Sequence, residues 1–192
     1  MKPKKNYVPG PQDNCQTPPY AITPLIQLIS DMTVWEPAAG QGYLVRALKE
    51  MGHKVFASDI MGKGVLANGV KYHDFFEPFP SWGKSADVQI TNPPFSWKFR
   101  WIERSYELGI PFALLLPMET LGAKSAQQFF QAGGMGLIVL DQRINFLMPT
   151  QQSWTESSAQ FPVAWFTHGL GIDGQIVYAS ISEERKQWLS TL

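Results

Sequence analysis

The spacing of apolar and polar residues predicts helices and strands that alternate along most of the chain. Apolar side chains recur at the spacing of one helical face over 19–30 and 43–52, and the second segment ends in glycine, a common helix terminator. Two further helices are predicted at 97–108 and 120–130. Short apolar runs predict eight strands, at 33–36, 53–60, 70–76, 86–90, 111–117, 136–146, 161–169 and 175–182.

This order of elements predicts an α/β fold built from βαβ units, with a mostly parallel sheet. Strands follow one another in the last third of the chain with little room for helices, so we expect antiparallel pairing at one edge of the sheet. Residues 1–16 are polar, contain several prolines, and are predicted to form an N-terminal arm before a single domain, 17–192. The polar stretch 149–160 is long enough for a loop with its own role.

Composition narrows the choice of partner. The 192 residues include 16 basic and 16 acidic side chains, so the chain lacks the strong positive charge of many nucleic-acid-binding proteins, although a local basic face is compatible with it. The single cysteine, Cys15, allows no intrachain disulfide and fits a reducing compartment. We find no signal peptide and no apolar run near the ~18 residues of a membrane span, and therefore expect a soluble, cytoplasmic protein with no membrane partner.

The first candidate site is the loop EPAAGQG, Glu36–Gly42, between the first strand and its helix. Its small residues let a ligand approach the backbone and the N–H groups of the helix start. Asp59 ends the next strand, where a carboxylate accepts hydrogen bonds from both hydroxyls of a ribose. Val45 breaks the dinucleotide pattern GxGxxG, and Glu36 would repel phosphate but pair with a cationic amine. S-adenosylmethionine meets these demands; the alternative for the loop alone is an ordinary strand-to-helix turn.

A second acidic candidate is Asp74, which follows the third predicted strand. Its carboxylate could accept a hydrogen bond from the adenine amine of the same cofactor. An Asp that caps a helix or a turn is an equally good interpretation. The three histidines are scattered, and with only Cys15 beside them they predict no metal site.

The second motif is TNPPF, Thr91–Phe95, which follows the strand at 86–90. An exocyclic amine conjugated to a ring is a poor nucleophile, and two acceptors, one for each N–H, would stabilise the positive charge that develops on it during methyl transfer. The side-chain oxygen of Asn92 and the carbonyl of Pro93 are such acceptors, and the two prolines hold them rigidly. Phe95 can stack on a planar substrate. The structural alternative is a proline-rich strand exit whose Asn caps the next helix.

Together, EPAAGQG, SDI, TNPPF and the N-terminal TPPYAITPLI resemble the class I methyltransferases that methylate amino groups. Over 16–168 the chain is most similar to DNA adenine N6-methyltransferases, especially small phage-encoded enzymes that act in a bacterial host. The resemblance implies a Rossmann-like, mostly parallel seven-stranded sheet with an antiparallel edge and helices on both faces. It also implies S-adenosylmethionine as cofactor and adenine in DNA as target.

The resemblance, with the motifs above, assigns site residues. The donor-binding set is Thr17, Pro18, Tyr20, Glu36, Pro37, Ala38, Gly40, Gly42, Asp59, Ile60, Asp74, Phe75 and Asn92. The catalytic set is Asn92, Pro93, Pro94 and Phe95. The substrate set is Phe95, Trp97, Lys98, Arg143 and Phe146. Within the substrate set, Phe146 matches a late aromatic that contacts the target base. Trp97 suits stacking or core packing equally. Lys98, like Arg100 and Arg104, faces DNA phosphates or is a solvated helix position, and Arg143 binds a phosphate or an acidic side chain.

Larger members of that group carry a separate target-recognition domain, for which this chain has no room. Selectivity must then be slight, or come from loops, from a second copy of the chain in a homodimer, or from a separate partner. Two other classes of methyltransferase hold an amine in the same way. One methylates a glutamine amide in protein, and its motif is usually NPPY. The other methylates a guanine amine in RNA. A donor-binding module without catalysis is the remaining alternative.

Overall fold

The computed structural model describes residues 13–61, 69–148, 151, 153–154 and 161–190. They form an eight-stranded mixed sheet, and all eight predicted strands are present, although most are shorter than predicted. The strands are β1 Val34–Glu36, β2 Val55–Asp59, β3 Lys71–Tyr72, β4 Val88–Thr91, β5 Phe112–Pro117, β6 Gly136–Leu140, β7 Val163–His168 and β8 Ile176–Ala179. Most of the polar stretch 149–160, to which a role was attributed, lies outside the described residues.

The strand order is β3-β2-β1-β4-β5-β7-β6-β8. β7 runs antiparallel to both β5 and β6, and every other pairing is parallel. The expected Rossmann-like, mostly parallel sheet with antiparallel pairing at its late end is therefore confirmed. The implied number of seven strands is one too few, because β8 adds a further parallel strand beyond β6.

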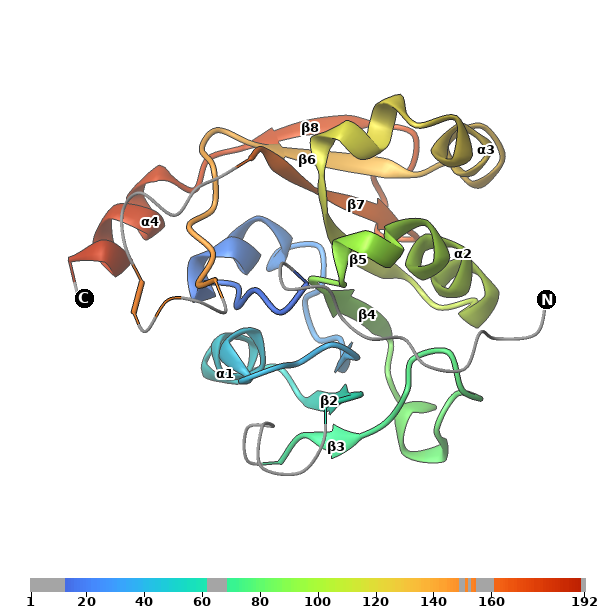
Figure 1. The fold of residues 1–192 in the computed structure, drawn as a ribbon, viewed down its shortest axis with the longest axis horizontal. Coiled ribbons are helices and arrows are strands. Elements are labelled where there is room, and N and C mark those ends of the chain that lie inside the picture. The colour runs from blue at the N-terminus through green and yellow to red at the C-terminus, as the bar shows by residue number, and fades with distance from the viewer. Residues whose placement is uncertain (1–12, 62–68, 149–150, 152, 155–160, 191–192) are drawn as a thin grey trace.

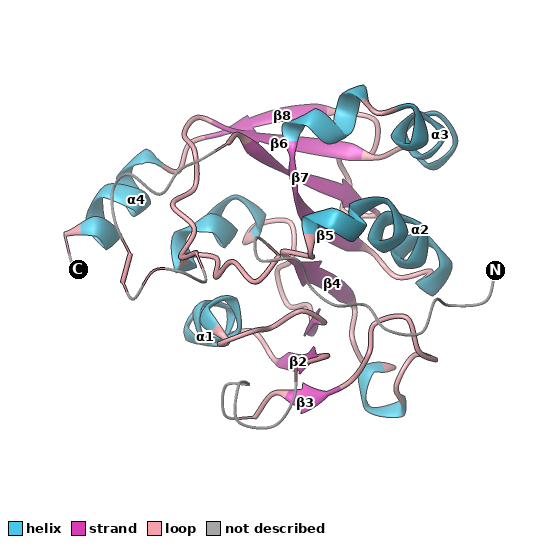
Figure 2. Ribbon diagram, in the orientation of Figure 1, coloured by secondary structure: helices cyan, strands magenta, loops and turns pink. Residues whose placement is uncertain are grey.

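Helices cover both faces of this sheet (Figures 1 and 2). One face carries the 3₁₀ helix η1, Pro19–Leu25, together with α1, Tyr43–Glu50, and α4, Ser182–Leu189. The other carries α2, Lys98–Leu108, and α3, Lys124–Gly133. Shorter 3₁₀ helices are η2 Ser81–Gly83, η3 Phe95–Trp97 and η4 Met118–Gly122.

Local sequence explains two departures from the predicted helices. The helix expected over 19–30 forms a 3₁₀ helix instead, because Pro24 lies inside it and has no N–H to donate to the preceding turn. The helix expected over 120–130 is divided into η4 and α3 at Ala123, whose backbone is extended. The helices predicted at 43–52 and 97–108 are confirmed as α1 and α2.

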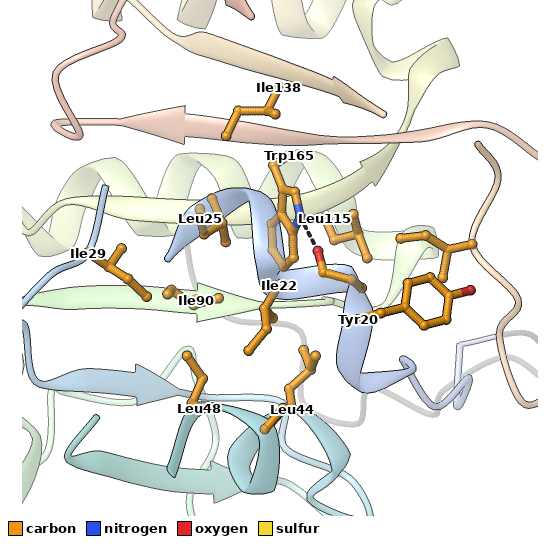
Figure 3. Packing of buried hydrophobic residues seen from close by; sticks show 14 of the residues in the cluster. Tyr20, Ile22, Leu25, Ile29, Leu44, Leu48, Ile90, Leu115, Ile138 and Trp165 are labelled. Atoms are coloured by element: carbon orange, nitrogen blue, oxygen red, sulfur yellow. Dashed lines mark hydrogen bonds between the residues drawn. The ribbon is translucent and has the colours of Figure 1, made fainter. Parts of the chain in front are cut away.

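The main core fills the space between the sheet and η1 (Figure 3). Ile22 and Leu25 of η1 are fully buried against strand residues such as Ile90. Trp165 of β7 is also fully buried, and its indole N–H donates to the carbonyl of Ala21 at 2.8 Å. Each of these large apolar side chains contributes roughly 1.5–3 kcal/mol through burial. This packing fixes η1, and with it the segment just before η1, over the centre of the sheet.

The parallel strands β1, β2 and β4 bring their carboxyl ends to one edge of the sheet. Glu36 ends β1, Asp59 ends β2, and Asn92 follows the last residue of β4. The strand order reverses between β1 and β4, and such switch points are where open α/β sheets bind ligands. No helix among the described residues has the length and apolar character needed to cross a membrane.

Candidate active site

A cavity of about 470 Å³ lies at this edge of the sheet. Its wall is formed by the ends of β1, β2 and β4, the segment 13–17, the segment 72–77 and the start of α2. The volume falls within the range of roughly 300–1,000 Å³ that is usual for small-molecule sites. The cavity joins the EPAAGQG loop, Asp59 and the TNPPF motif, which the sequence predicted to act together.

Glu36 is the most unusual charged group of the cavity. Its side chain is almost completely buried, and its Oε1 accepts a hydrogen bond from the N–H of Ala38 at 2.9 Å. Its Oε2 is buried and forms no hydrogen bond of good geometry within the described residues, although the Thr91 hydroxyl lies close enough to lower the pKa of the carboxyl. Burial raises the pKa of Glu36 to about 8 because the charged form loses hydration, and the Thr91 hydroxyl and the Ala38 N–H offset this effect only in part. A cationic ligand group would supply the missing partner.

Gly40 and Gly42 shape the loop in different ways. Gly40 lines the cavity with a φ of 50°, and a Cβ at this position would lie 2.8 Å from Oε1 of Gln16. Gly42 has a φ of 78° and begins α1, but it does not line the cavity. The positive φ favours glycine at both positions, and a Cβ at position 40 would in addition displace the flexible end of the Gln16 side chain. Pro37 and Ala38, which the sequence assigned to the donor-binding set, line the cavity beside Gly40.

Asp59 connects the loop to the second strand. Its Oδ2 accepts the N–H of Gly40 at 2.8 Å, and its Oδ1 accepts the N–H of Met61 at 2.8 Å. Burial raises the pKa of Asp59, and these backbone donors offset part of the rise. Because each carboxylate oxygen has a second lone pair, the side chain can hold the loop and also accept ligand hydroxyls. Ile60, also predicted, lines the cavity next to it.

Asp74 lines the cavity and also stabilises a turn. Its Oδ1 accepts the N–H of Phe76 at 2.9 Å, which is the turn role considered as the alternative from the sequence. Its other oxygen leaves acceptor capacity for a ligand. Phe75 lines the same wall, and its ring stacks on Trp101 at 3.9 Å and 5°.

The cavity is acidic. Five of its lining residues carry carboxylates, and one carries a guanidinium group. The acids are Asp13, Glu36, Asp59, Asp74 and Glu77, and the base is Arg100. This balance favours a cationic ligand and disfavours a pyrophosphate, as the absence of a GxGxxG pattern also indicated.

Asn92 lies where the cavity meets the TNPPF motif. Its Nδ2 donates to the hydroxyl oxygen of Thr17 at 2.9 Å, which fixes the side-chain orientation. Its Oδ1 is buried and has no hydrogen-bond partner within the described part of the chain. A buried amide oxygen without a partner is costly, by about 1–3 kcal/mol, unless a ligand provides a donor. Thr17, Asn92 and Pro94 all line the cavity, and Pro93 is buried beside them.

The two predicted base-contacting rings lie together but outside this cavity. The rings of Phe95 and Phe146 meet edge to face with centroids 6.3 Å apart. Phe161 contacts both, at 5.6 Å from Phe95 and at 6.1 Å from Phe146, with which it is stacked. Phe146 is only 2% exposed, whereas Phe95 is half-buried. The three rings form an aromatic group, and none of them lines the cavity.

Several predicted residues do not reach the cavity. The hydroxyl of Tyr20 donates to Oδ1 of Asn145 at 3.4 Å and accepts the backbone N–H of Asn145 at 3.0 Å, so this side chain fixes the segment before Phe146. Pro18 is buried and does not line the cavity. Lys98 pairs with Glu119 at 3.2 Å, and Arg143 is exposed on a loop away from the lining residues.

Arg104, considered as a phosphate-facing residue, has other partners. It donates to the carbonyls of Phe75 and Glu77 and pairs with Glu107 at 3.0 Å. Its guanidinium group therefore holds the segment that carries Asp74. Lys98 and Arg104 both act here as structural side chains.

Two lining residues were not predicted for the cavity: Gln16 was not singled out from the sequence, and Arg100 was interpreted only as a phosphate-facing or solvated helix position. The guanidinium of Arg100 lies 4.3 Å from the ring centroid of Trp97 and 4.7 Å from that of Phe76. Trp97, predicted to stack or pack, thus stacks with a cation at the cavity wall. The i,i+3 spacing of Trp97 and Arg100 was a usable signal, because such residues share one helical face. Gln16 gave no signal beyond its position next to Thr17.

Comparisons with known proteins identify the fold. No known protein family matches the sequence, and no curated protein matches it significantly. Among solved structures, it is similar to a candidate class I S-adenosylmethionine-dependent methyltransferase from Listeria monocytogenes, with a TM-score of 0.57, 14% identity, and 97% and 72% of the two chains covered. A candidate RNA methyltransferase from Pyrococcus horikoshii gives 0.52, 16% identity and 77% of each chain. The chain therefore has the fold of class I methyltransferases.

A third similar structure is a modification subunit of a candidate type I restriction enzyme from Vibrio vulnificus. The TM-score is 0.52 at 13% identity, and the match covers 92% of this chain but 53% of that subunit. This chain thus corresponds to about half of that longer protein.

Among the described residues, no group of three or more His, Cys, Asp or Glu side chains has the arrangement of a metal site.

Proposed function

We propose that the protein transfers a methyl group from S-adenosylmethionine to the exocyclic amine of adenine in DNA. The observation that carries this proposal is the side chain of Asn92. Its amide nitrogen is held by Thr17, and its oxygen is buried at the donor cavity without a partner among the described residues. That oxygen is an acceptor available to an N–H that no described residue provides.

The cavity residues fit the proposed donor group by group. The unpartnered Oε2 of Glu36 suits the cationic α-amino group, and the remaining lone pairs of Asp59 suit the ribose hydroxyls. The acidic wall suits the positive charge of a sulfonium ion, and Asp74 with Phe75 and Phe76 suits the adenine ring and its amine. Ala38 and Gly40 line the cavity, and residues this small let a ligand approach the protein backbone.

When bound, the donor supplies a methyl carbon on a sulfonium, so the amine lone pair forms the new N–C bond as the C–S bond breaks and its electrons remain on sulfur. Asn92 accepts one N–H of the amine and the Pro93 carbonyl accepts the other, which stabilises the charge that develops on nitrogen. Thr17 keeps the oxygen of Asn92 directed at the amine. The proton leaves the product amine to water after the methyl group has arrived, so no strong protein base is required.

Adenine in DNA is the target we favour because TNPPF and the donor loop together most resemble adenine N6-methyltransferases. The target base is hidden in a duplex and must be flipped out or already single-stranded. Phe95 lies at the end of the catalytic turn, beside the rings of Phe146 and Phe161, where it can stack on an extruded base. Sequence selectivity would be slight, or come from loops, from a second copy of the chain or from a separate specificity subunit.

The test is incubation of the protein with labelled donor and equal amounts of DNA, RNA and protein extract, followed by digestion and mass spectrometry. We expect the label as N6-methyladenine from DNA. Label in methylguanine from RNA or in methylglutamine from protein would refute the substrate but keep the methyltransferase. Donor binding by calorimetry with no transfer to any of the three would instead indicate a binding module. Asn92→Ala serves as the matched inactive control.

A further inference from the structure

Residues 13–17, called the strap below, run from η3 to the donor loop. Asp13 begins the strap: its Oδ1 accepts the backbone N–H of Ser96 at 3.1 Å, and its Oδ2 accepts the Ser96 hydroxyl at 2.6 Å. Thr17 ends the strap with the 2.9 Å hydrogen bond to Asn92. Ser96 directly follows Phe95, so the strap holds the tetrapeptide Asn92–Phe95 at both ends.

The middle of the strap is attached to the donor loop. Oε1 of Gln16 accepts the N–H of Gln41 at 3.0 Å. The same oxygen lies close to Gly40, 2.8 Å from where a Cβ of residue 40 would be. The backbone of Gln16 also pairs with Leu147 in both directions, at 2.9 and 3.0 Å. Leu147 is the neighbour of Phe146. One short segment therefore contacts the donor loop, the catalytic turn and the strand exit that carries the aromatic group.

The two hydrogen bonds to Ser96 distinguish Asp13 from an ordinary surface acid. A carboxylate that accepts a backbone N–H and a hydroxyl makes charge-assisted hydrogen bonds, which are shorter and stronger than neutral ones. The two bonds reach across 83 positions of sequence to the residue after the tetrapeptide. Pro93 and Pro94 make the turn stiff, so fixing Ser96 at one end and Asn92 at the other sets the position of the whole turn.

We propose that the strap aligns the catalytic turn with the donor cavity, and that Asp13 is its positioning residue. This inference rests on the proposed function. Asp13 acts through Ser96 on Pro94 and Phe95, while Thr17 acts on Asn92 directly. Asp13 is one of the acidic lining residues, but both of its carboxylate oxygens bond to Ser96, so its loss leaves Glu36, Asp59 and Asp74 in place for the donor and releases the far end of the turn. Because small displacements of reacting groups are expensive in rate, the effect falls on the transfer step and not on donor affinity.

The experiment compares Asp13→Ala, Ser96→Ala, the double variant and Asp173→Ala in the full-length protein. Asp173 is the matched control, because its carboxylate also accepts a backbone N–H, that of Gly169, at 2.9 and 3.1 Å, but near the end of β7 at the opposite edge of the sheet. We expect Asp13→Ala to lower the single-turnover rate at saturating donor roughly ten-fold and to change the donor Kd by less than about three-fold. Ser96→Ala removes only the hydroxyl bond to Asp13 and keeps the backbone one, so the double variant should be little slower than Asp13→Ala alone, which already loses both bonds.

Hydrogen exchange provides a readout that does not depend on activity. The amides of Phe95, Ser96 and Trp97 should exchange roughly ten-fold faster in Asp13→Ala, because Ser96 loses its acceptor, and should be unchanged in Asp173→Ala. Exchange at Ser96 that is equal in Asp13→Ala and wild type would overturn the positioning role. So would a rate loss that higher donor concentration restores, because Asp13 would then act on donor affinity. If wild-type protein methylates nothing, the exchange result still tests the strap, and the proposed function alone fails.

Discussion

The substitution Glu36→Gln should raise the stability of the folded protein at alkaline pH and lower its affinity for the donor. Burial raises the pKa of the Glu36 carboxyl from an ordinary value of 4.5 to about 8. The folded state therefore binds this proton more tightly than the unfolded state. The resulting contribution to stability is complete below pH 4.5 and is lost as the pH rises through 8.

The size of this effect follows from the difference between the folded and unfolded pKa values of Glu36. A tenfold change in proton affinity corresponds to about 1.4 kcal/mol, so ionising Glu36 in the folded protein costs roughly 5 kcal/mol as an upper bound at pH 9. Glutamine has nearly the same volume, keeps an oxygen for the N–H of Ala38, and cannot ionise. We expect Glu36→Gln and wild type to have similar free energies of unfolding at pH 5, and the variant to be more stable by several kcal/mol at pH 9.

The same carboxyl makes donor binding depend on pH. Pairing with a cationic amine requires the ionised form, so donor affinity should rise by up to about ten-fold for each pH unit between roughly pH 6 and 8. It should decline again at higher pH as the donor amine, with a pKa of about 8, loses its proton. The variant should bind the donor more weakly and show a much flatter rise over the same pH range.

The assays are denaturant unfolding at pH 5, 7 and 9, and calorimetric titration in buffers of different ionisation enthalpy. At pH 7 the wild type should release close to one proton on binding the donor, and Glu36→Gln should release almost none. Methylthioadenosine, which lacks the amino acid part, is the ligand control and should bind with little pH dependence. Equal proton release by wild type and variant would refute the assignment of Glu36 to the donor amine.

Three further predictions concern the other site residues. Asp59→Ala should weaken donor binding about ten-fold or more, because the ribose hydroxyls lose a charged acceptor and the N–H of Gly40 loses its own; unchanged affinity by calorimetry would remove Asp59 from the site. Asn92→Ala should leave donor affinity nearly intact and lower turnover by roughly 10²-fold; full turnover in a steady-state assay would refute the role of its amide oxygen. Phe146→Ala should cost about 3–5 kcal/mol of stability because the ring is buried, whereas Phe95→Ala should lower turnover more; thermal unfolding and initial rates separate the two effects, and the reverse pattern would contradict them.

Much of the fold followed from the sequence because the sheet strands are short apolar runs that alternate with helical segments. The eighth strand was also visible there, and only the family resemblance suggested seven. Helix α4 was missed because residues 175–182 were assigned to a strand and the helix has almost no apolar face of its own. Its Trp188 packs on Tyr20 and Trp154, and contacts of that kind between distant segments leave no local pattern.

Part of the candidate site could likewise be predicted from the sequence, and part could not. Glu36, Asp59 and Asn92 were predicted together because the carboxyl ends of neighbouring parallel strands share one edge, and this needs only the strand order. The contacts of Asp13 and Gln16 could not be predicted, since each depends on where a polar segment at the start of the chain lies against the finished sheet. The boundary placed between 16 and 17 stays a prediction, although residues 13–16 contact the domain closely.

The close contact between Gln16 and Gly40 has a consequence for how related sequences can diverge. A side chain at 40 would meet the end of the glutamine at 2.8 Å, and the φ of 50° adds strain for any residue with a Cβ. The two positions should therefore change together during evolution: a long side chain at 16 should coincide with glycine at 40, and alanine or serine at 40 with a short residue at 16. Relatives that keep the pair would inherit the same connection between the strap and the donor loop, and relatives that replace it would need another way to hold their amino-terminal segment against the sheet.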